Sequence, residues 1–366
     1  MTDSISAPPN QSLPTRLTRV ARIPGLRALL WSGDILYASR GYGLLSARIQ
    51  DPAQSIHWQT VAEFHPTLRH RLSVRNRLTA RLFREGFHAL ASTDSGALIA
   101  AVPGAIVTRA PGRTEFRQTH VITRGTRPLH ITAVPGGGIF WGEYFDNATR
   151  DEVHIYASTG TGATWGGERW SIAYTFPKGA IRHVHNIVHD PWGDCLWVLT
   201  GDYGNECRIL RADCDFSHVE VVLQGKQQAR AVAAIPTEDA LYFSSDTPLE
   251  SNFLYRLDRR GALSQLAPIS NSSIYGCRVG DNVFFSTMVE PSDVNRDQHV
   301  RVYGGGGIAN PWQQLLTWKK DHWPMGLFQY GNAFLPDGHN TTPYLAVTTI
   351  AVECDDMVTS LYSVVP

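Results

Sequence analysis

Short apolar, β-rich stretches separated by turn-forming residues recur along most of the chain. Segments such as RALLWSGDILYASR, LHITAVPGGGIFWGEY and SIYGCRVGDNVFFSTMVE each hold two such stretches around Gly, Asp, Asn or Pro. Short runs of this kind are typical of strands, and the central turn residues predict β-hairpins. Helical patterns are scarce, and only residues 69–83, RHRLSVRNRLTARLF, could form a helix with arginines on a polar face. The pattern therefore predicts an all-β fold.

The predicted hairpin recurs at intervals that suggest a repeated unit. Its turns centre near residues 33, 95, 137, 193, 238, 281 and 331, which gives spacings of 62, 42, 56, 45, 43 and 50 residues. A four-stranded propeller blade takes about 40–50 residues, and a second pair of β stretches follows several of the hairpins. We therefore predict a single-domain β-propeller over residues 15–366, with seven four-stranded blades. Six blades and one irregular unit would also fit the spacings.

The N-terminal segment suggests how such a ring closes. Residues 15–23, TRLTRVARI, precede the first hairpin and could form the outer strand of the last blade, which would remove an exposed sheet edge. Residues 1–14 are polar and contain proline, so they are predicted to be a disordered leader. They lack the basic start and apolar stretch of a signal peptide, which favours a cytoplasmic location. A processed N-terminus would be compatible with a secreted or periplasmic protein.

Composition restricts the possible partners. The chain has 33 basic and 33 acidic residues and a pI near 7.2, so no global charge favours nucleic acid or an anionic membrane. No apolar run reaches the roughly 18 residues of a membrane helix. The five cysteines include no C-x-x-C pair, which argues against a disulfide framework and a zinc knuckle.

One segment resembles a known motif. Residues 155–165, IYASTGTGATW, are similar to the Asp-box, S-x-D-x-G-x-T-W, of sialidase-like propellers. Gly160 stands where the family has its aspartate, so the box is degenerate. The positions that match are Ser158, Gly162, Thr164 and Trp165. In that family the box is a turn between outer strands, so the resemblance concerns the fold and not the chemistry.

Further segments extend this resemblance. The sequence ARIPGL is similar to the R-I-P start of sialidases, which would give Arg22 the role of binding a substrate carboxylate. FWGEYF, IRHVHN, WVLTGD and SSDTPLESN, within residues 80–335, resemble bacterial sialidase-superfamily propellers described as glycosyl hydrolases or BNR-repeat proteins. The resemblance implies a propeller that acts on carbohydrate and assigns no catalytic residue. A single degenerate box and the lack of an arginine triad argue against true sialidase activity.

Propeller topology predicts that distant polar residues meet. The first strand of each blade begins at the face where the second strand ends, so these positions should converge in a ring around the axis. A polar ring on an apolar wall is suited to ligand binding. The first-strand starts hold His88, His130, His183, His185, Arg230, Tyr275 and Arg278, and the second-strand ends hold Arg40, Glu143, Tyr144, Asp202, Asp246, Glu290, Asp337 and His339.

The histidines allow three interpretations. At strand period, His183 and His185 share one face, and with His130 or His88 they could bind a divalent metal ion at the central channel. A histidine could instead act as general acid or base. The third interpretation is that satisfied histidines support a substrate pocket. His189 lies further along the strand and is predicted to be a turn residue.

Other residues suggest carbohydrate chemistry. Two of Glu143, Asp202, Asp246 and Glu290 could serve as the acid and the base or nucleophile of a glycoside hydrolase, and Glu143 could support Tyr144 as a nucleophile. Arginines could pair with a substrate carboxylate. The residues predicted to contact substrate are Arg40, His88, His130, Arg182, Arg230, Glu250, Arg278 and Glu290.

Three functions follow from this set. The leading hypothesis is a glycoside hydrolase that cleaves an oligo- or polysaccharide at the channel mouth. The second is a polysaccharide lyase, in which a histidine or tyrosine removes the proton beside a uronate carboxylate that arginine or a metal ion neutralises. The third is a non-catalytic propeller that binds glycans or proteins, because a fold does not settle a function.

Overall fold

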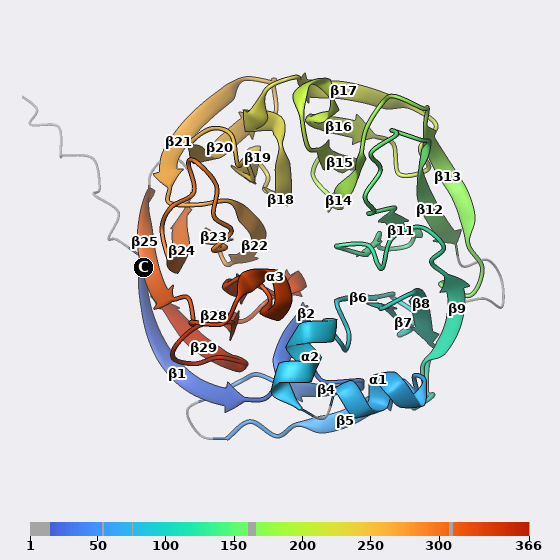
Figure 1. Ribbon diagram of the computed structural model, residues 1–366, viewed down its shortest axis with the longest axis vertical. Helices are drawn as coiled ribbons and strands as arrows, with labels where there is room; N and C mark the ends of the chain where they lie inside the picture. The colour runs from blue at the N-terminus through green and yellow to red at the C-terminus, as the bar shows by residue number, and fades with distance from the viewer. Residues whose placement is uncertain (1–14, 53–54, 75, 160–165, 307–309, 366) are drawn as a thin grey trace, which may run out of the picture.

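The strands form a closed ring of radial sheets (Figure 1). The computed structural model describes residues 15–365 except 53–54, 75, 160–165 and 307–309. Within these residues there are seven sheets, six of four strands and one with an additional fifth strand. The predicted all-β propeller with seven four-stranded blades is therefore confirmed. The predicted leader, residues 1–14, lies outside the described residues.

The blades follow one another in chain order. Blade 1 contains β2 (Arg27–Gly33), β3 (Ile35–Arg40), β4 (Gly43–Arg48) and β5 (Gln59–Glu63), and blade 2 contains β6 (Ala89–Ser92), β7 (Leu98–Val102), β8 (Ala105–Arg109) and β9 (Arg117–Val121). Blade 3 contains β10 (Thr132–Ala133), β11 (Gly138–Gly142), β12 (Val153–Thr159) and β13 (Ser171–Phe176). Blade 4 contains β14 (His183–Asp190), β15 (Cys195–Gly201), β16 (Arg208–Ala212) and β17 (Val219–Gln224).

The remaining blades complete the ring. Blade 5 contains β18 (Ala231–Pro236), β19 (Ala240–Ser245), β20 (Asn252–Asp258) and β21 (Leu263–Ile269), and blade 6 contains β22 (Ser273–Val279), β23 (Asn282–Thr287), β24 (His299–Gly306) and β25 (Asn310–Lys319). Blade 7 contains β26 (Asn332–Phe334), β28 (Tyr344–Ile350), β29 (Val358–Val365) and β1 (Arg16–Pro24). We call the face at which the innermost strands begin the upper face.

The two ends of the chain close the ring. Strand β1 pairs antiparallel with β29, from Arg16 opposite Val365 to Pro24 opposite Val358. The predicted closing strand is therefore confirmed, and it covers an edge that would otherwise expose unpaired backbone groups. Among the described residues, no helix has the length and apolar character needed to cross a membrane.

The seventh hairpin differs from its prediction. A turn near Gly331 was expected, but β26 pairs with β28 across a longer connection. That connection contains β27 (Asp337–Asn340), which runs parallel to the half of β2 that is furthest from the upper face. Gly338 makes this approach possible, because a Cβ atom there would lie 2.2 Å from the Trp31 carbonyl oxygen. An extra innermost strand therefore lies inside the ring at its lower half.

Helices cover part of the upper face. The segment predicted to be helical forms α1 (Leu68–Ser73) and α2 (Arg77–Phe83), and the Asn76 side chain caps α2 by accepting from the Leu78 amide at 2.8 Å. Arg81 of α2 is buried and donates to the Phe328 carbonyl at 3.0 Å and to Asp321 at 2.7 Å. Phe328 ends α3 (Met325–Phe328), so the hydrogen bonds of Arg81 to its carbonyl hold together the two helices, which lie side by side (Figure 1).

Candidate functional site

Strand pairing brings two acidic residues beside two basic strand starts on the upper face. In blade 4, His183 at the start of β14 lies opposite Gly201 at the end of β15, so Asp202 follows directly beside the histidine. In blade 5, the Asp246 amide donates to the Arg230 carbonyl at 2.8 Å. The predicted convergence of strand starts and strand ends therefore occurs in these two neighbouring blades.

His183, His185 and Asp202 form a compact triad. The Nε2 atoms of the two histidines are 3.1 Å apart, and the Asp202 Oδ1 atom lies 3.4 Å from one and 3.3 Å from the other. All three residues are buried. A register shift between Val184 and Asn186 marks a β-bulge at His185. Bulges redirect side chains and are frequent near functional sites.

Each imidazole of the triad directs a bare nitrogen at the other. His183 Nδ1 lies 3.0 Å from the Phe145 carbonyl oxygen, and His185 Nδ1 lies 2.9 Å from the Ala231 carbonyl oxygen. Because a carbonyl only accepts, both Nδ1 atoms carry the proton, and in the neutral rings both Nε2 atoms are lone pairs. Two lone pairs and a carboxylate oxygen within 3.4 Å of one another are favourable only with positive charge between them, supplied either by a proton on an Nε2 atom or by a bound cation.

The separations fit a metal ion. Ligand atoms about 2.1 Å from one ion lie about 3.0 Å apart at right angles and about 3.4 Å apart at tetrahedral angles. The three observed distances fall within that range. Two histidines and one carboxylate are a known donor set for divalent transition metals, and backbone carbonyls that hold Nδ1–H orient metal-binding histidines in the same manner.

The third member of the triad is not the one predicted. His130 was expected to join the other two histidines, but its Nδ1 atom lies 3.1 Å from Asp337 Oδ2. Its ring also contacts the ring of Tyr275 at 6.3 Å between centroids. Asp202 takes the third position because it follows β15, the strand paired with β14.

Asp202 is held by four cationic or ionisable neighbours. Burial alone would raise its pKa, but the imidazoles of His183 and His185 beside it hold the pKa well below its usual value. Arg182 Nη1 donates to Asp202 Oδ2 at 3.1 Å, and Arg230 Nη2 lies 3.3 Å from Oδ1. The carboxylate is therefore ionised at neutral pH, as a metal ligand must be.

Arg230 links the triad to a second carboxyl group. Its Nη2 atom lies 3.6 Å from Asp246 Oδ2, while its Nε and Nη1 atoms are buried without a partner among the described residues. The Tyr203 ring centroid lies 5.8 Å from the guanidinium carbon. The guanidinium thus retains donors that a substrate carboxylate could accept from.

The acidic side chains next to Arg230 differ from Asp202. Burial raises the pKa of Asp246 to about 7, a shift that the Arg230 charge opposes and the neighbouring Glu290 reinforces. Burial also raises the pKa of Glu290. Arg230 lies at the long end of ion-pair range from Asp246, so desolvation of the carboxyl dominates. Asp246 can therefore carry a proton near neutral pH.

We expect this burial to make stability depend on pH. A carboxyl with a pKa of about 7 when folded and about 4 when unfolded favours the folded state below pH 4 and loses that contribution as the pH rises to 7. The Asp246→Asn variant has no carboxyl to ionise and lacks this loss. From pH 4 to pH 8 its free energy of unfolding should therefore rise relative to that of the wild type, by on the order of 3 kcal/mol. Urea unfolding at both pH values measures the difference, with Asp293→Asn on an exposed loop as the control. If the variant and the wild type differed in free energy of unfolding by the same amount at pH 4 and pH 8, Asp246 would not be a buried protonated carboxyl.

Tyr144 stands beside the triad. Its ring centroid lies 4.3 Å from that of His183. Burial, together with the negative charges of Asp202 and Asp246, raises the pKa of Tyr144 to about 12. A cation bound at the triad would oppose the field of these carboxylates and stabilise the phenolate.

Besides His88 and His130, four predicted site residues take no part in the triad. Glu143 is buried in an ion pair with Arg124 and accepts from the His154 amide at 2.8 Å, so it stabilises blade 3 and is not available as a nucleophile. The other three have no side-chain contact to the triad among the described residues. Arg40 and Glu250 are exposed at the surface, and Arg278 lies next to the hairpin turn, where it donates to the Gly280 carbonyl at 2.7 Å.

The features attributed to the sialidase resemblance lie elsewhere. Arg22 is in the outermost strand of blade 7 and pairs with Asp355 at 2.8 Å, with half of its side chain exposed. It is therefore not at the upper-face site, and its proposed role in carboxylate binding is wrong. The central residues of the Asp-box, 160–165, lie outside the described residues. His189 pairs with Leu196 inside β14, next to the β14–β15 turn, so it is a strand residue and not the predicted turn residue.

Sequence reasoning missed several supporting residues. Gln227 donates to the Asp202 carbonyl at 3.1 Å from the short helix η2 (Gln227–Ala229), and no pattern marked it. Arg27 begins β2, so the rule that selected other strand starts would have found it. Arg84 and Arg127 lie in connections between blades, for which strand periodicity gives no signal.

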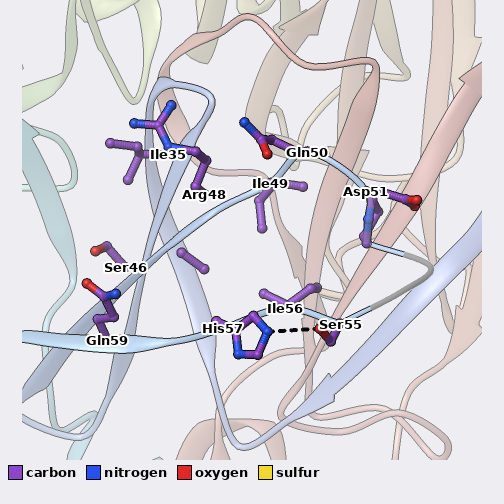
Figure 2. Close-up of a pocket in the computed structure, with 12 residues that line it drawn as sticks. Ile35, Ser46, Arg48, Ile49, Gln50, Asp51, Ser55, Ile56, His57 and Gln59 are labelled. Carbon is purple, nitrogen blue, oxygen red and sulfur yellow. Dashed lines mark hydrogen bonds between the residues drawn. The ribbon is translucent and has the colours of Figure 1, made fainter.

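A depression in the described surface lies away from the triad. It has a volume of about 520 Å³ and lies against the outer strands of blade 1, lined by Ile35, Arg48, Ile49 and His57 among others (Figure 2). Its polar groups are engaged locally, since Arg48 pairs with Asp34 and Ser55 lies 3.0 Å from His57 Nε2. It contains no convergence of ionisable groups comparable to the triad.

Comparison with known proteins supports the fold. The chain is similar to a chain of a mitotic checkpoint complex (TM-score 0.56, 10% identity, covering 100% of this chain and 99% of that one). It is also similar to the WD40 β-propeller domain of Doa1, with a TM-score of 0.56 and 9% identity over 95% of this chain and 97% of that one. A chain of a nidogen/laminin complex is similar with a TM-score of 0.50 and 12% identity over 81% of this chain and 96% of that one. At these identities the similarity concerns the fold alone. No protein-family profile matches the sequence, and no curated protein is similar to it, so the resemblance to sialidases is supported only as far as the propeller.

Proposed function

We propose that this propeller is a divalent-metal-dependent polysaccharide lyase that cleaves a uronate-containing saccharide at its upper face. The observation that carries the proposal is the triad of His183, His185 and Asp202, in which bare nitrogens and a carboxylate oxygen converge within 3.4 Å. Beside it, Arg230 retains two buried donors without a partner among the described residues. A metal ion and a guanidinium side by side are suited to neutralising a carboxylate.

The neighbouring residues supply the proton transfers of an elimination. Tyr144, in phenolate form, would remove the proton from the carbon that bears the carboxylate. The electron pair left behind forms a double bond to the adjacent carbon, and the glycosidic oxygen leaves from that carbon. Asp246, whose pKa is about 7, would give its proton to the departing oxygen. The bound metal ion would withdraw charge from the substrate carboxylate, and no water is consumed.

The same contacts disfavour the hydrolase hypothesis. A glycoside hydrolase needs one protonated and one ionised carboxyl on either side of the bond. Glu143 is occupied by Arg124, and Asp202 is occupied by the histidines and two arginines. The remaining pair, Asp246 and Glu290, both lie where burial raises the pKa, which disfavours the ionised form that one of them would need. Elimination needs no such pair.

The test is metal-dependent formation of an unsaturated product. Protein treated with a chelator and then resupplied with Mn²⁺ or Zn²⁺ is incubated with uronate polymers that it binds. We expect near-ultraviolet absorption of the unsaturated product to rise only with metal present, by at least about 100-fold over the chelated protein. Arg230→Gln should lower kcat/KM. Arg278→Gln is the control and should not, because Arg278 lies next to the β22–β23 turn, at the end of blade 6 that is far from the upper face.

The outcomes separate the three functions. New reducing ends without ultraviolet absorption would show a hydrolase and overturn the proposal. A bound uronate polymer that stays intact with every metal supplied would indicate a non-catalytic binding propeller, an outcome that the WD40 and nidogen/laminin neighbours make relevant.

A further inference from the structure

Three arginines gather on the upper face around the start of blade 2, apart from the triad. Arg27 begins β2 and donates to the His88 carbonyl at 3.2 Å and to the Phe87 carbonyl at 3.4 Å. Arg127, between β9 and β10, donates to the Arg84 carbonyl at 3.2 Å. Arg84 follows α2. We call Arg27, Arg84 and Arg127 the arginine cluster.

The carboxylates in the neighbourhood of the arginine cluster are shared with other groups. Glu85 accepts from Ser73 at 2.6 Å, lies 2.9 Å from His70 Nδ1 and is bonded to the Tyr42 hydroxyl. Asp337 interacts electrostatically with Arg27, but it also contacts His130 at 3.1 Å. Glu290 lies near Arg84, but it also interacts with Arg230 and Tyr330. The three guanidinium groups therefore lack a matched set of counter-charges.

Burial and mutual repulsion make the positive charges of the arginine cluster unfavourable. Burial, with the like charges of Arg27 and Arg84, lowers the pKa of Arg127 to about 10. Burial and the positive charges of Arg127 and Arg27 also lower the pKa of His88 well below its usual value, so that His88 stays neutral. The Arg27 Nε atom is buried and has no partner among the described residues. An anion among these groups would relieve both the repulsion and the unsatisfied donor.

One member of the arginine cluster, Arg27, is held in place before any ligand binds. Its guanidinium carbon lies 4.0 Å from the Phe334 ring centroid, which fixes its plane. The backbone of Arg84 is positioned by α2, and α2 is tied to α3 by the buried Arg81. A fixed guanidinium fork loses little side-chain entropy when it binds a carboxylate or sulfate.

We propose that Arg27, Arg84 and Arg127 form a second anion-binding site, which takes the carboxylate or sulfate of another sugar residue of the same chain. The identity of that chain rests on the proposed function, whereas anion binding itself needs no metal ion. Glu290 lies near both Arg84 and Arg230, which places the arginine cluster next to the triad side of the upper face. The substrate would then be a polyanionic saccharide with acidic groups on at least two residues.

Calorimetric titration of metal-free protein tests the second site. The probes are inorganic sulfate, trigalacturonate and the neutral sugar maltotriose. We expect sulfate and trigalacturonate to bind and maltotriose not to bind. Arg127→Gln and Arg84→Gln should each weaken anion binding by at least about 10-fold, since a charge-assisted hydrogen bond contributes 1.5–3 kcal/mol. Arg117→Gln, on the exposed outer strand of blade 2, should bind like the wild type.

A variant of the triad separates this inference from the proposed function. His185→Ala should bind sulfate as tightly as the wild type, because His185 is not part of the arginine cluster. If the arginine variants lose anion binding while no uronate polymer is cleaved, the second site is right and the lyase assignment is wrong. If cleavage occurs and the arginine variants bind sulfate and trigalacturonate unchanged, the second site is overturned and the lyase assignment remains.

Discussion

Replacing His185 with alanine is expected to abolish divalent-metal binding and, with it, cleavage of uronate polymers. The imidazole Nε2 of His185 lies 3.1 Å from that of His183 and 3.3 Å from Asp202 Oδ1, so its removal leaves two of three donors. Loss of a direct ligand should weaken metal binding by at least the 10–100-fold that supporting residues contribute.

Melting curves with and without metal make this result independent of activity. A ligand that binds only the folded state raises the melting temperature, so added Mn²⁺ or Zn²⁺ should stabilise the wild type and leave His185→Ala unchanged. His189→Ala is the matched control, because His189 lies on the same strand near the far turn. Metal analysis of the purified proteins should give the same order. Equal metal content in His185→Ala and the wild type would refute the triad as a metal site.

Introducing a single methyl group at Gly201 is expected to disrupt the same site without removing any ligand. A Cβ atom there would lie 2.4 Å from the Cε1 atom of His185. The Nε2 and Nδ1 atoms of the same ring would lie 3.1 and 3.3 Å from it. The His185 ring cannot retreat freely, because it is buried and its Nδ1 atom is bonded to the Ala231 carbonyl. Gly201→Ala should therefore displace the ring and weaken metal binding by at least about 10-fold.

The overlap should also lower stability. Overpacking a buried position costs about 1–3 kcal/mol, which urea unfolding can measure beside the metal titration. Gly326→Ala in α3 is the control, because a Cβ atom there meets nothing within 4 Å. A Gly201→Ala protein with wild-type metal affinity would show that the His185 ring is not held where the structure places it.

The sequence by itself determined the repeat and therefore the ring. Apolar, β-rich stretches and turn residues at near-regular spacing predicted hairpins, and these correspond to strand pairs in blades 1 to 6. The pattern is local, since each hairpin is marked by its own two stretches and the turn residues between them. The same reasoning identified β1 as the closing strand. It failed at blade 7, because the long connection that holds β27 has no counterpart in the other units.

Part of the site followed from the same topology. Knowing where strands begin and end was enough to place His183, His185, Asp202, Arg230 and Asp246 on one face. Sequence could not say which of them touch, because a β-bulge at His185 and the pairing of β14 with β15 decide the triad. Sequence also could not show that Glu143 forms an ion pair with Arg124, since that contact joins side chains 19 positions apart in the chain.

Tertiary structure alone decided the charge state and the second cluster. Asp202 and Asp246 end similar sequences, LTGD and FSSD, yet the two neighbouring histidines lower the pKa of Asp202, while burial raises that of Asp246. Arg84 and Arg127 come from connections without periodicity, and only the ring brings them to Arg27. The sequence pattern of a strand indicates which of its side chains are buried. The pKa of an ionisable side chain depends on every group around it, and those groups come from other blades.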